Sequence, residues 1–200
     1  MKRSVCVLVS GGLDSCVMLA GLAKRYRVVH PLYIRHGLRW EDAELRHLRR
    51  FLCATSLPPV TVLRLPVCDL YGAHWSLSGK NVPGTKSRDE AVYLPGRNLL
   101  LLAKAAVFCA QRGIGTIAIG TLRGNPFADT TPRFFRDFAR MSGVRVIAPL
   151  RGLTKEQVFR RGRGLPLHLT FSCINPQHGS HCGRCNKCEE RRCVFQGVGE

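Results

Sequence analysis

The chain has 200 residues, 45% of them hydrophobic, and its 31 Lys and Arg residues against 13 Asp and Glu residues give a net charge of +18. This length and apolar fraction suit one domain with a real core and exclude global disorder. Because no apolar run reaches about 18 residues, we expect no membrane-spanning segment. The short apolar run near the start leads into Ser-Gly-Gly rather than a cleavage site, so we expect a cytoplasmic protein.

Strands and helices alternate along the first third of the chain. Residues 3–9 form a continuous apolar run, typical of a strand buried on both faces. A helical stripe over 14–25 follows, then a strand over 27–34, a helix over 41–54 and a strand over 60–65. This alternation predicts an α/β fold, a Rossmann-like parallel sheet of about five strands with helices on both faces.

Residues 66–93 have no clean period and are rich in Gly, Pro, Ser, Lys and Asp, which is typical of a lid, a binding loop or a disordered segment. A second loop is expected over 123–131. Thr154 followed by Gln157 predicts a capping box at a helix start. The remaining expected elements are helices over 98–111, 132–141 and 154–163 and strands over 116–120 and 144–148.

The stretch Ser10-Gly-Gly-Leu-Asp-Ser15 lies between the first strand and the first helix. Glycine lets the backbone approach a ligand closely, and unpaired N–H groups at a helix start attract an anion. We therefore predict a phosphate cradle; the alternative is an ordinary turn in which Asp14 only favours the first helical turn. The predicted ATP-binding residues are Val9, Ser10, Gly11, Gly12, Leu13, Asp14, Ser15, Cys16, Val17, Met18 and Leu19.

The ten cysteines fall into two groups. Those among apolar neighbours are interpreted as small buried thiols, namely Cys6, Cys16, Cys53, Cys68 and Cys109. The other five crowd the C-terminus, namely Cys173, Cys182, Cys185, Cys188 and Cys193, and the first four of these have the spacing of metal ligands. Four thiolates satisfy tetrahedral Zn²⁺ with no position left for water, so we predict a structural site that pins a loop-like C-terminus.

Alternatives to this zinc site stay open at the level of the sequence. An iron–sulfur cluster uses similar ligands. His178 or His181, which lie between the first two cysteines of the set, can replace one of the ligands. Cys193 is interpreted as a spare thiol on the face of a helix.

Three features of the sequence together resemble a known family. The glycine-rich stretch resembles the pyrophosphate loop of the N-type ATP pyrophosphatases, which adenylate an oxygen and release pyrophosphate. With Leu94-Pro-Gly-Arg-Asn98 and the cysteine spacing, the chain resembles the 7-cyano-7-deazaguanine synthases from about residue 2 to about residue 195. The resemblance implies an N-type ATP pyrophosphatase domain over 1–165 and, packed on it, a four-cysteine zinc-binding segment over 166–200.

The resemblance also implies an activity and its cofactors. Those enzymes use ATP twice, converting 7-carboxy-7-deazaguanine and ammonia to an amide and then to a nitrile in the queuosine precursor pathway. A Mg²⁺-ATP site and one structural Zn²⁺ are implied. Asp14 acts through Mg²⁺ or by orienting the loop, Arg97 is the candidate cation after the Pro95-Gly96 turn, and Lys155 is the candidate phosphate contact.

The stretch Gly124–Pro132 departs from the aromatic loop that holds the deazaguanine in typical synthases. Asp129 can pair with a guanine-like N1–H and 2-amino edge, Phe127 can stack on the base, and Arg97 is assigned to the substrate as well. His36 after the second strand is interpreted as structural. The segment 33–44 also departs from the family pattern, so ATP chemistry transfers more directly than substrate identity.

Two other functions stay open. The same adenylation chemistry can act on a different carboxylate or on a base in RNA, and the arginine excess suits such a phosphate-rich partner. Nucleic acid is nevertheless not the favoured partner, because no aromatic residues are interleaved with the basic ones. A non-catalytic, zinc-dependent nucleotide-binding module is the third possibility, against which the intact loop argues. The expected partners are the small acid and ammonia, and a homodimer stays open.

Overall fold

Five parallel strands form one sheet in the computed structural model, which describes residues 2–197. The strand order is β3-β2-β1-β4-β5, so the chain builds outward from β1 first on one side and then on the other. Ligands bind open α/β sheets at the carboxyl ends of strands where this direction reverses, here between β1 and β4. The strands are β1 (Lys2–Leu8), β2 (Tyr26–Arg35), β3 (Thr61–Arg64), β4 (Thr116–Ala118) and β5 (Arg145–Ile147).

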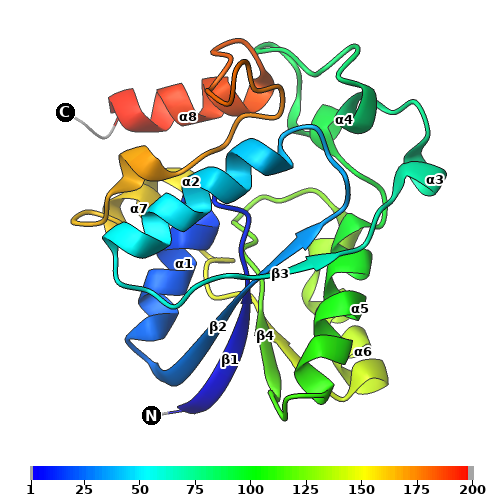
Figure 1. The fold of residues 1–200 in the computed structure, drawn as a ribbon, viewed down its shortest axis with the longest axis vertical. Helices are drawn as coiled ribbons and strands as arrows, with labels where there is room; N and C mark the ends of the chain where they lie inside the picture. Colours follow the sequence, from blue (N-terminus) through cyan, green and yellow to red (C-terminus); the bar gives the residue numbers. More distant parts are fainter. Residues whose placement is uncertain (1, 198–200) are drawn as a thin grey trace.

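Helices cover both faces of the sheet (Figure 1), and the alternation of β1 side chains explains why. Val5 and Val7 are fully buried in a cluster with α1, α2 and α7, whereas Cys6 and Leu8 point into a second cluster with α5 and α6. A strand that is apolar on both faces needs helices on each side. The helices are α1 (Leu13–Ala23), α2 (Glu41–Ala54), α5 (Arg97–Ala110), α6 (Pro132–Ser142) and α7 (Lys155–Arg161).

The C-terminal segment packs across the carboxyl ends of the strands, with α8 (Asn186–Gly197) at the upper end of Figure 1. Phe171 is fully buried in a third apolar cluster that includes Trp40, Leu94 and three of the four C-terminal cysteines. Its N–H donates to the Gly11 carbonyl at 2.8 Å. The segment is thereby fastened directly to the glycine-rich loop. A single turn of 3₁₀ helix, η3 (Leu167–Leu169), precedes it.

The predicted fold class is confirmed, and so is the capping box of α7, in which Thr154 and Gln157 exchange hydrogen bonds. The predicted elements agree with the observed ones to within a few residues. Among residues 2–197, no helix is both long enough and apolar enough to cross a membrane. The ends of the predicted units at residues 1 and 200 lie outside the described residues.

The interpretation of residues 66–93 as a loop without secondary structure is wrong in part. The segment contains α3 (Cys68–Tyr71), α4 (Trp75–Ser78) and the 3₁₀ turn η1 (Asp89–Val92). It is held by tertiary contacts, since the Tyr71 hydroxyl donates to the Pro95 carbonyl at 2.8 Å and the Asn186 N–H donates to the Pro83 carbonyl at 3.0 Å. A single-turn helix is too short to leave a hydrophobic period in the sequence.

Two further expectations are wrong. Cys53 and Cys68 are exposed rather than buried, because each lies on the outer side of its helix. The loop-like C-terminus is helical over α8, which gives no apolar stripe and buries only a few of its side chains.

Candidate functional site

The glycine-rich loop between β1 and α1 is shaped by its own hydroxyl groups. The Gly12 N–H donates to Ser10 Oγ at 3.3 Å, the Ser10 N–H donates to Ser15 Oγ at 3.2 Å, and Ser15 Oγ donates to the Gly12 carbonyl at 3.0 Å. No side chain caps α1 at Gly12. The first-turn N–H groups of α1 are therefore left for a ligand, and the helix dipole favours an anion there.

Gly11 sets the course of this loop. Its φ of +75° is one that L-residues rarely adopt, and a Cβ at this position would lie 2.8 Å from the Glu44 carbonyl oxygen and 3.2 Å from Leu48 Cβ. The loop therefore touches α2 directly through its backbone.

Replacing Gly11 with alanine is expected to lower the free energy of unfolding by about 1–3 kcal/mol, because the side chain adds backbone strain and a clash. Urea unfolding measures the change. Gly21→Ala is the matched control: this glycine is exposed inside α1, and an added methyl group would meet nothing within 4 Å. That change is expected to stabilise the protein by about 0.5–1 kcal/mol. Equal midpoints for the two variants would contradict the prediction.

A cavity of about 530 Å³ lies at the carboxyl end of β4, beside the glycine-rich loop. The predicted site residues that line it are Ser10, Gly12, Leu13, Asp14, Arg97, Phe127, Asp129 and Lys155. The predicted residues that do not line it are Val9, Gly11, Ser15, Cys16, Val17, Met18 and Leu19. Most residues of this second group belong to the apolar core on which the loop rests.

Lys155 joins the glycine-rich loop to the C-terminal helix. Its Nζ lies 2.7 Å from Asp14 Oδ2 and 3.2 Å from Glu190 Oε1 on α8. Lys187 continues the chain of charges, with its Nζ 3.0 Å from Glu190 Oε2 and 3.2 Å from Asp89 Oδ1. Burial would lower the pKa of Lys155, but the two carboxylates outweigh it and raise the pKa, so Lys155 carries its positive charge into the cavity.

The other oxygen of Asp14, Oδ1, is buried and takes no hydrogen bond among the residues that the structure describes. A buried carboxylate oxygen without a donor is costly unless a ligand satisfies it. Arg97 likewise has a buried Nε without a partner in the described part of the chain. Both residues line the cavity, so the protein leaves one hydrogen-bond acceptor and one donor there for a ligand.

Asp129 is fixed at the start of α5. Its Oδ2 accepts the Asn98 N–H at 3.2 Å, and its Oδ1 accepts the Asn98 side-chain amide at 3.1 Å. It belongs to the 3₁₀ turn η2 (Ala128–Thr130) and is 7% exposed. A carboxylate is favourable at a helix N-terminus, so Asp129 holds the loop after β4 against α5.

Two aromatic pairs line the same cavity. The rings of Tyr93 and Phe127 stack with centroids 4.5 Å apart, and those of Trp40 and Trp75 stack at 5.7 Å. Flat apolar surfaces beside charged groups suit a ligand that has both a planar ring and an anionic part.

Prediction from the sequence missed several charged residues of the cavity, among them Glu44, Lys187 and Glu190. Glu44 left a usable signal, because it shares a helix face with the buried Leu48 and Phe51, and a carboxylate on an apolar face is unusual. The α8 pair left none, since charged residues between cysteines are ordinary for a surface.

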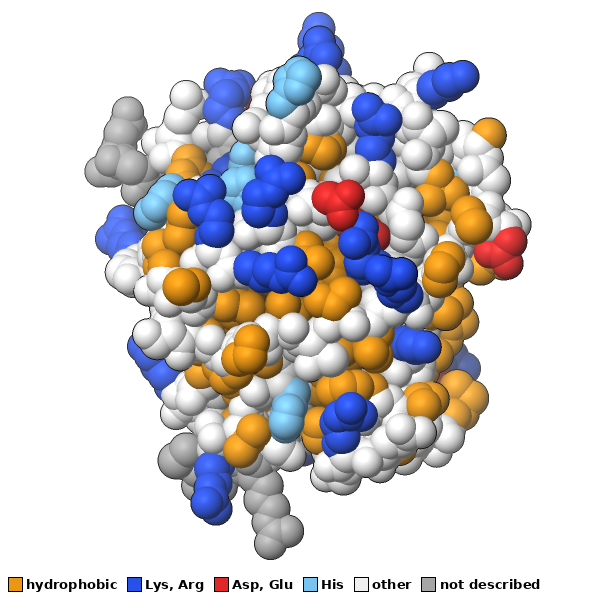
Figure 2. Space-filling model, viewed as in Figure 1, with side chains coloured by type: hydrophobic (Ala, Val, Ile, Leu, Met, Phe, Trp, Pro, Cys, Tyr) orange, Lys and Arg blue, Asp and Glu red, His pale blue; other side chains and the backbone are white. Residues whose placement is uncertain are grey.

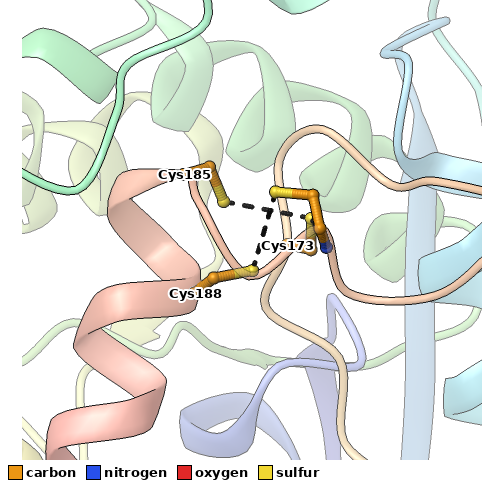
Figure 3. Close-up of side chains that lie close together, drawn as sticks. Cys173, Cys185 and Cys188 are labelled. Atoms are coloured by element: carbon orange, nitrogen blue, oxygen red, sulfur yellow. Dashed lines mark hydrogen bonds between the residues drawn. The ribbon is translucent and has the colours of Figure 1, made fainter.

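The four predicted metal ligands converge: the sulfur atoms of Cys173, Cys182, Cys185 and Cys188 lie within 4.8 Å of one another. Figure 3 shows three of them, Cys173, Cys185 and Cys188, with their side chains pointing toward one another. The N–H groups of Asn175 and Cys182 both donate to Cys173 Sγ at 3.3 Å. Such donors stabilise a thiolate, and four thiolates at this spacing can hold a tetrahedral metal ion.

The histidines near this cluster have other partners. His181 Nε2 accepts the Ser172 N–H at 3.2 Å, and burial lowers its pKa to about 4. Neither His178 nor His181 belongs to the group of ligand atoms found among the described residues. Cys193 lies exposed on α8, which confirms the expected spare thiol. His36 is 1% exposed and its Nδ1 pairs with the Leu65 carbonyl at 2.8 Å, outside the cavity lining.

The parallel sheet, the glycine-rich loop after β1 and the charged cavity beside that loop are the features expected of the N-type ATP pyrophosphatase class. A family model described as "Queuosine biosynthesis protein QueC" matches residues 4–199, and the chain belongs to this family. This confirms the resemblance to the 7-cyano-7-deazaguanine synthases that the motifs indicate.

Curated relatives cover nearly the whole chain. The 7-cyano-7-deazaguanine synthase of Methanothermobacter thermautotrophicus is 30% identical over 98% of this chain and 96% of its own length. That of Anaeromyxobacter sp. (strain Fw109-5) is 32% identical over 99% of this chain and 93% of its own.

Solved structures share the fold at low identity. A predicted tRNA methyltransferase subunit from Methanocaldococcus jannaschii has a TM-score of 0.55 at 16% identity, covering 82% of this chain and 76% of that one. The U34-tRNA thiolase NcsA from Methanococcus maripaludis with its [4Fe-4S] cluster has a TM-score of 0.55 at 12% identity, covering 99% and 70%.

Proposed function

We propose that the enzyme converts 7-carboxy-7-deazaguanine and ammonia to 7-cyano-7-deazaguanine through adenylated intermediates. The observation that carries the proposal is one cavity that holds the phosphate loop, the Lys155–Asp14 pair, Arg97 and a stacked aromatic pair. The names of the curated relatives support the product, 7-cyano-7-deazaguanine.

The chemistry explains why these groups belong together. A carboxylate reacts poorly with ammonia because its oxygen is a poor leaving group, and adenylation makes that oxygen a good one. The first-turn amides of α1 bind the phosphates, while Lys155 and Arg97 stabilise the charge that develops during transfer. Arg97 is also suited to orient the substrate carboxylate, which matches its fork of N–H donors.

Mg²⁺ fits this cavity through Asp14, whose buried Oδ1 lacks a hydrogen-bond donor in the described chain. When bound, the ion neutralises charge on the phosphates of ATP. Asp14 Oδ2 meanwhile holds Lys155 at 2.7 Å, so one carboxylate serves both cations.

The deazapurine ring is assigned to the loop after β4. Phe127, already stacked on Tyr93, supplies a flat surface for the ring. Both Asp129 oxygens accept an N–H from Asn98, and each retains a second lone pair that can meet the guanine-like edge. Asp129 thereby positions the base relative to α5.

We assign one structural Zn²⁺ to the four-cysteine cluster, because four sulfur ligands leave no open position for chemistry. The unit proposed over 166–200 carries this site, and its helix α8 supplies Lys187 and Glu190 to the cavity wall. The metal then helps to position α8, and through α8 it positions the two charged residues of the cavity wall without contacting the ligand.

One surface feature favours the second candidate, adenylation of a base in RNA. A hollow of about 630 Å³ between α2 and β3 is lined by five arginines, Arg35, Arg46, Arg49, Arg50 and Arg64. Figure 2 shows Lys and Arg side chains gathered on this face of the molecule. Phosphate backbones bind such surfaces, although Asp42 pairs with Arg35 at 2.6 Å and reduces the local charge.

ATP–pyrophosphate exchange tests the proposal. Adding 7-carboxy-7-deazaguanine is expected to raise exchange by about tenfold or more, because pyrophosphate release requires an acceptor acid. Exchange that needs another carboxylate or an RNA instead would favour the second candidate. No exchange with any acceptor would indicate a non-catalytic nucleotide-binding module.

A further inference from the structure

Glu44 is a carboxylic acid on the apolar face of α2 that reaches the cavity wall. It is 8% exposed, and its Oε2 accepts the Tyr33 hydroxyl at 2.7 Å. No hydrogen bond to Oε1 occurs within the described part of the chain. The glycine-rich loop lies against the backbone of the same residue, as the Gly11 contact shows.

Glu41, one turn earlier on α2, makes the contrast clear. Its carboxylate accepts the N–H groups of His36 at 2.6 Å and Gly37 at 3.1 Å and pairs with Arg35 at 3.4 Å. It does not line the cavity. Both oxygens of the Glu41 carboxylate are thus taken by neighbouring groups of the protein, whereas Glu44 has an oxygen available to a ligand.

The charges around Glu44 come from several elements. Arg97 on α5 attracts it, Tyr33 on β2 donates to it, Glu41 on the same helix repels it, and the Cys16 thiol on α1 lies nearby. Burial dominates and raises the pKa of Glu44 to about 8, while Arg97 and Tyr33 oppose the rise. A carboxyl group with this pKa can take up and release a proton at the slightly alkaline pH at which the enzyme is to be assayed.

We propose that Glu44 binds ammonium in this cavity and accepts its proton, which frees the nitrogen to attack the activated carboxyl carbon. This rests on the proposed function. A small cation needs an anion within the cavity. Asp14 also has an oxygen without a hydrogen-bond donor, but that oxygen is assigned to Mg²⁺ above. Glu44 is the other cavity carboxylate that lies against the glycine-rich loop, and its Oε1 is left for the ammonium ion.

Ammonium has four protons, and the amide nitrogen of the product keeps two of them. The first passes to Glu44, and the released lone pair forms the C–N bond. The C–O bond to AMP then breaks with its electron pair on the oxygen, and the departing AMP takes the second proton. Glu44 afterwards returns its proton to water through the cavity mouth.

Glu44→Gln separates this step from adenylation. At pH 7.5 the variant is expected to keep acid-dependent ATP–pyrophosphate exchange within about threefold of wild type and to lose ammonium-dependent product formation by about 100-fold or more. The matched control is Glu156→Gln, an exposed carboxylate on α7 outside the cavity lining, which is expected to change neither rate.

The pH dependence of turnover separates the proposed role of Glu44 from a purely structural one, because a structural role would leave the shape of the pH profile unchanged. Wild-type turnover on ammonium chloride should rise to about pH 8 and then level, whereas the variant, limited to free ammonia, should keep rising to about pH 9 and approach wild type. Tyr33→Phe removes the phenol donor, which should raise the pKa of Glu44 and shift the wild-type plateau to higher pH.

Three results would overturn the inference: unchanged product formation in Glu44→Gln, equal losses of exchange and product formation, or an unshifted plateau in Tyr33→Phe. If the wild-type enzyme itself shows no exchange with 7-carboxy-7-deazaguanine, the proposed function fails first, and this inference fails with it. The exchange assay thus tells the two failures apart.

Discussion

Replacing Cys185 with serine is expected to release the metal ion and to lower Tm by about 10 °C or more, because metal binding and folding are thermodynamically linked. Cys185 is 2% exposed at the centre of the cluster, and its sulfur lies 3.9 Å from that of Cys173. A serine hydroxyl is a poor substitute for a thiolate ligand. Thermal unfolding and elemental analysis for zinc and iron measure the two effects.

Cys193→Ser is the matched control, since this cysteine is exposed on α8, the helix that follows Cys185, and stands apart from the cluster. It is expected to keep full metal content and Tm. Unchanged metal in Cys185→Ser would refute the assignment of the cluster. If elemental analysis finds iron rather than zinc in the wild-type protein, the cluster is to be assigned as an iron–sulfur centre.

Replacing Asp14 with asparagine is expected to reduce ATP turnover by about 100-fold or more while Tm changes little. The change removes the charge that holds Lys155 and the oxygen assigned to Mg²⁺, yet it keeps the shape of the side chain. Glu190 still holds Lys155 at 3.2 Å. Pyrophosphate release, measured beside a thermal melt, reports both quantities.

Asp137→Asn provides the control for the loss of one negative charge, because this residue is half exposed on α6 and forms its ion pairs with neighbouring arginines of that helix. Its turnover should equal that of wild type. Turnover within about threefold of wild type in Asp14→Asn would remove the residue from the phosphate site.

The sheet and its covering helices were predictable because they leave periods in the sequence. Apolar runs such as that of β1 need helices on both faces, and parallel connections fix the layers. The position of the glycine-rich loop was predictable for a related reason, since its glycines and hydroxyls are close together in sequence and follow a buried strand. Its binding of ATP stays a prediction.

Long-range charge contacts were harder to predict. Lys155 and Asp14 are 141 residues apart in sequence, and only the resemblance to a family singled both out. Glu190 and Lys187 depend on where α8 docks. That helix has no apolar stripe. It is held by the cysteine cluster, by the Arg191 guanidinium, which donates to Thr170 Oγ1 at 2.7 Å, and by Phe195, whose ring packs on that of Phe159.

The short helices over 66–93 show the same limit. Each consists of a single turn, which is stabilised by contacts with distant residues rather than by its own sequence. Glu44 is the residue that closer attention to pattern would have found, as a charge on an otherwise apolar helix face.

The pairing of Lys155 with carboxylates from distant parts of the sequence has a consequence for biosynthesis. Asp14 leaves the ribosome well before Lys155, and Glu190 emerges later than both. A nascent polypeptide therefore contains the glycine-rich loop long before it can form both ion pairs of Lys155. The wall of the cavity is therefore complete only after α8 has been translated.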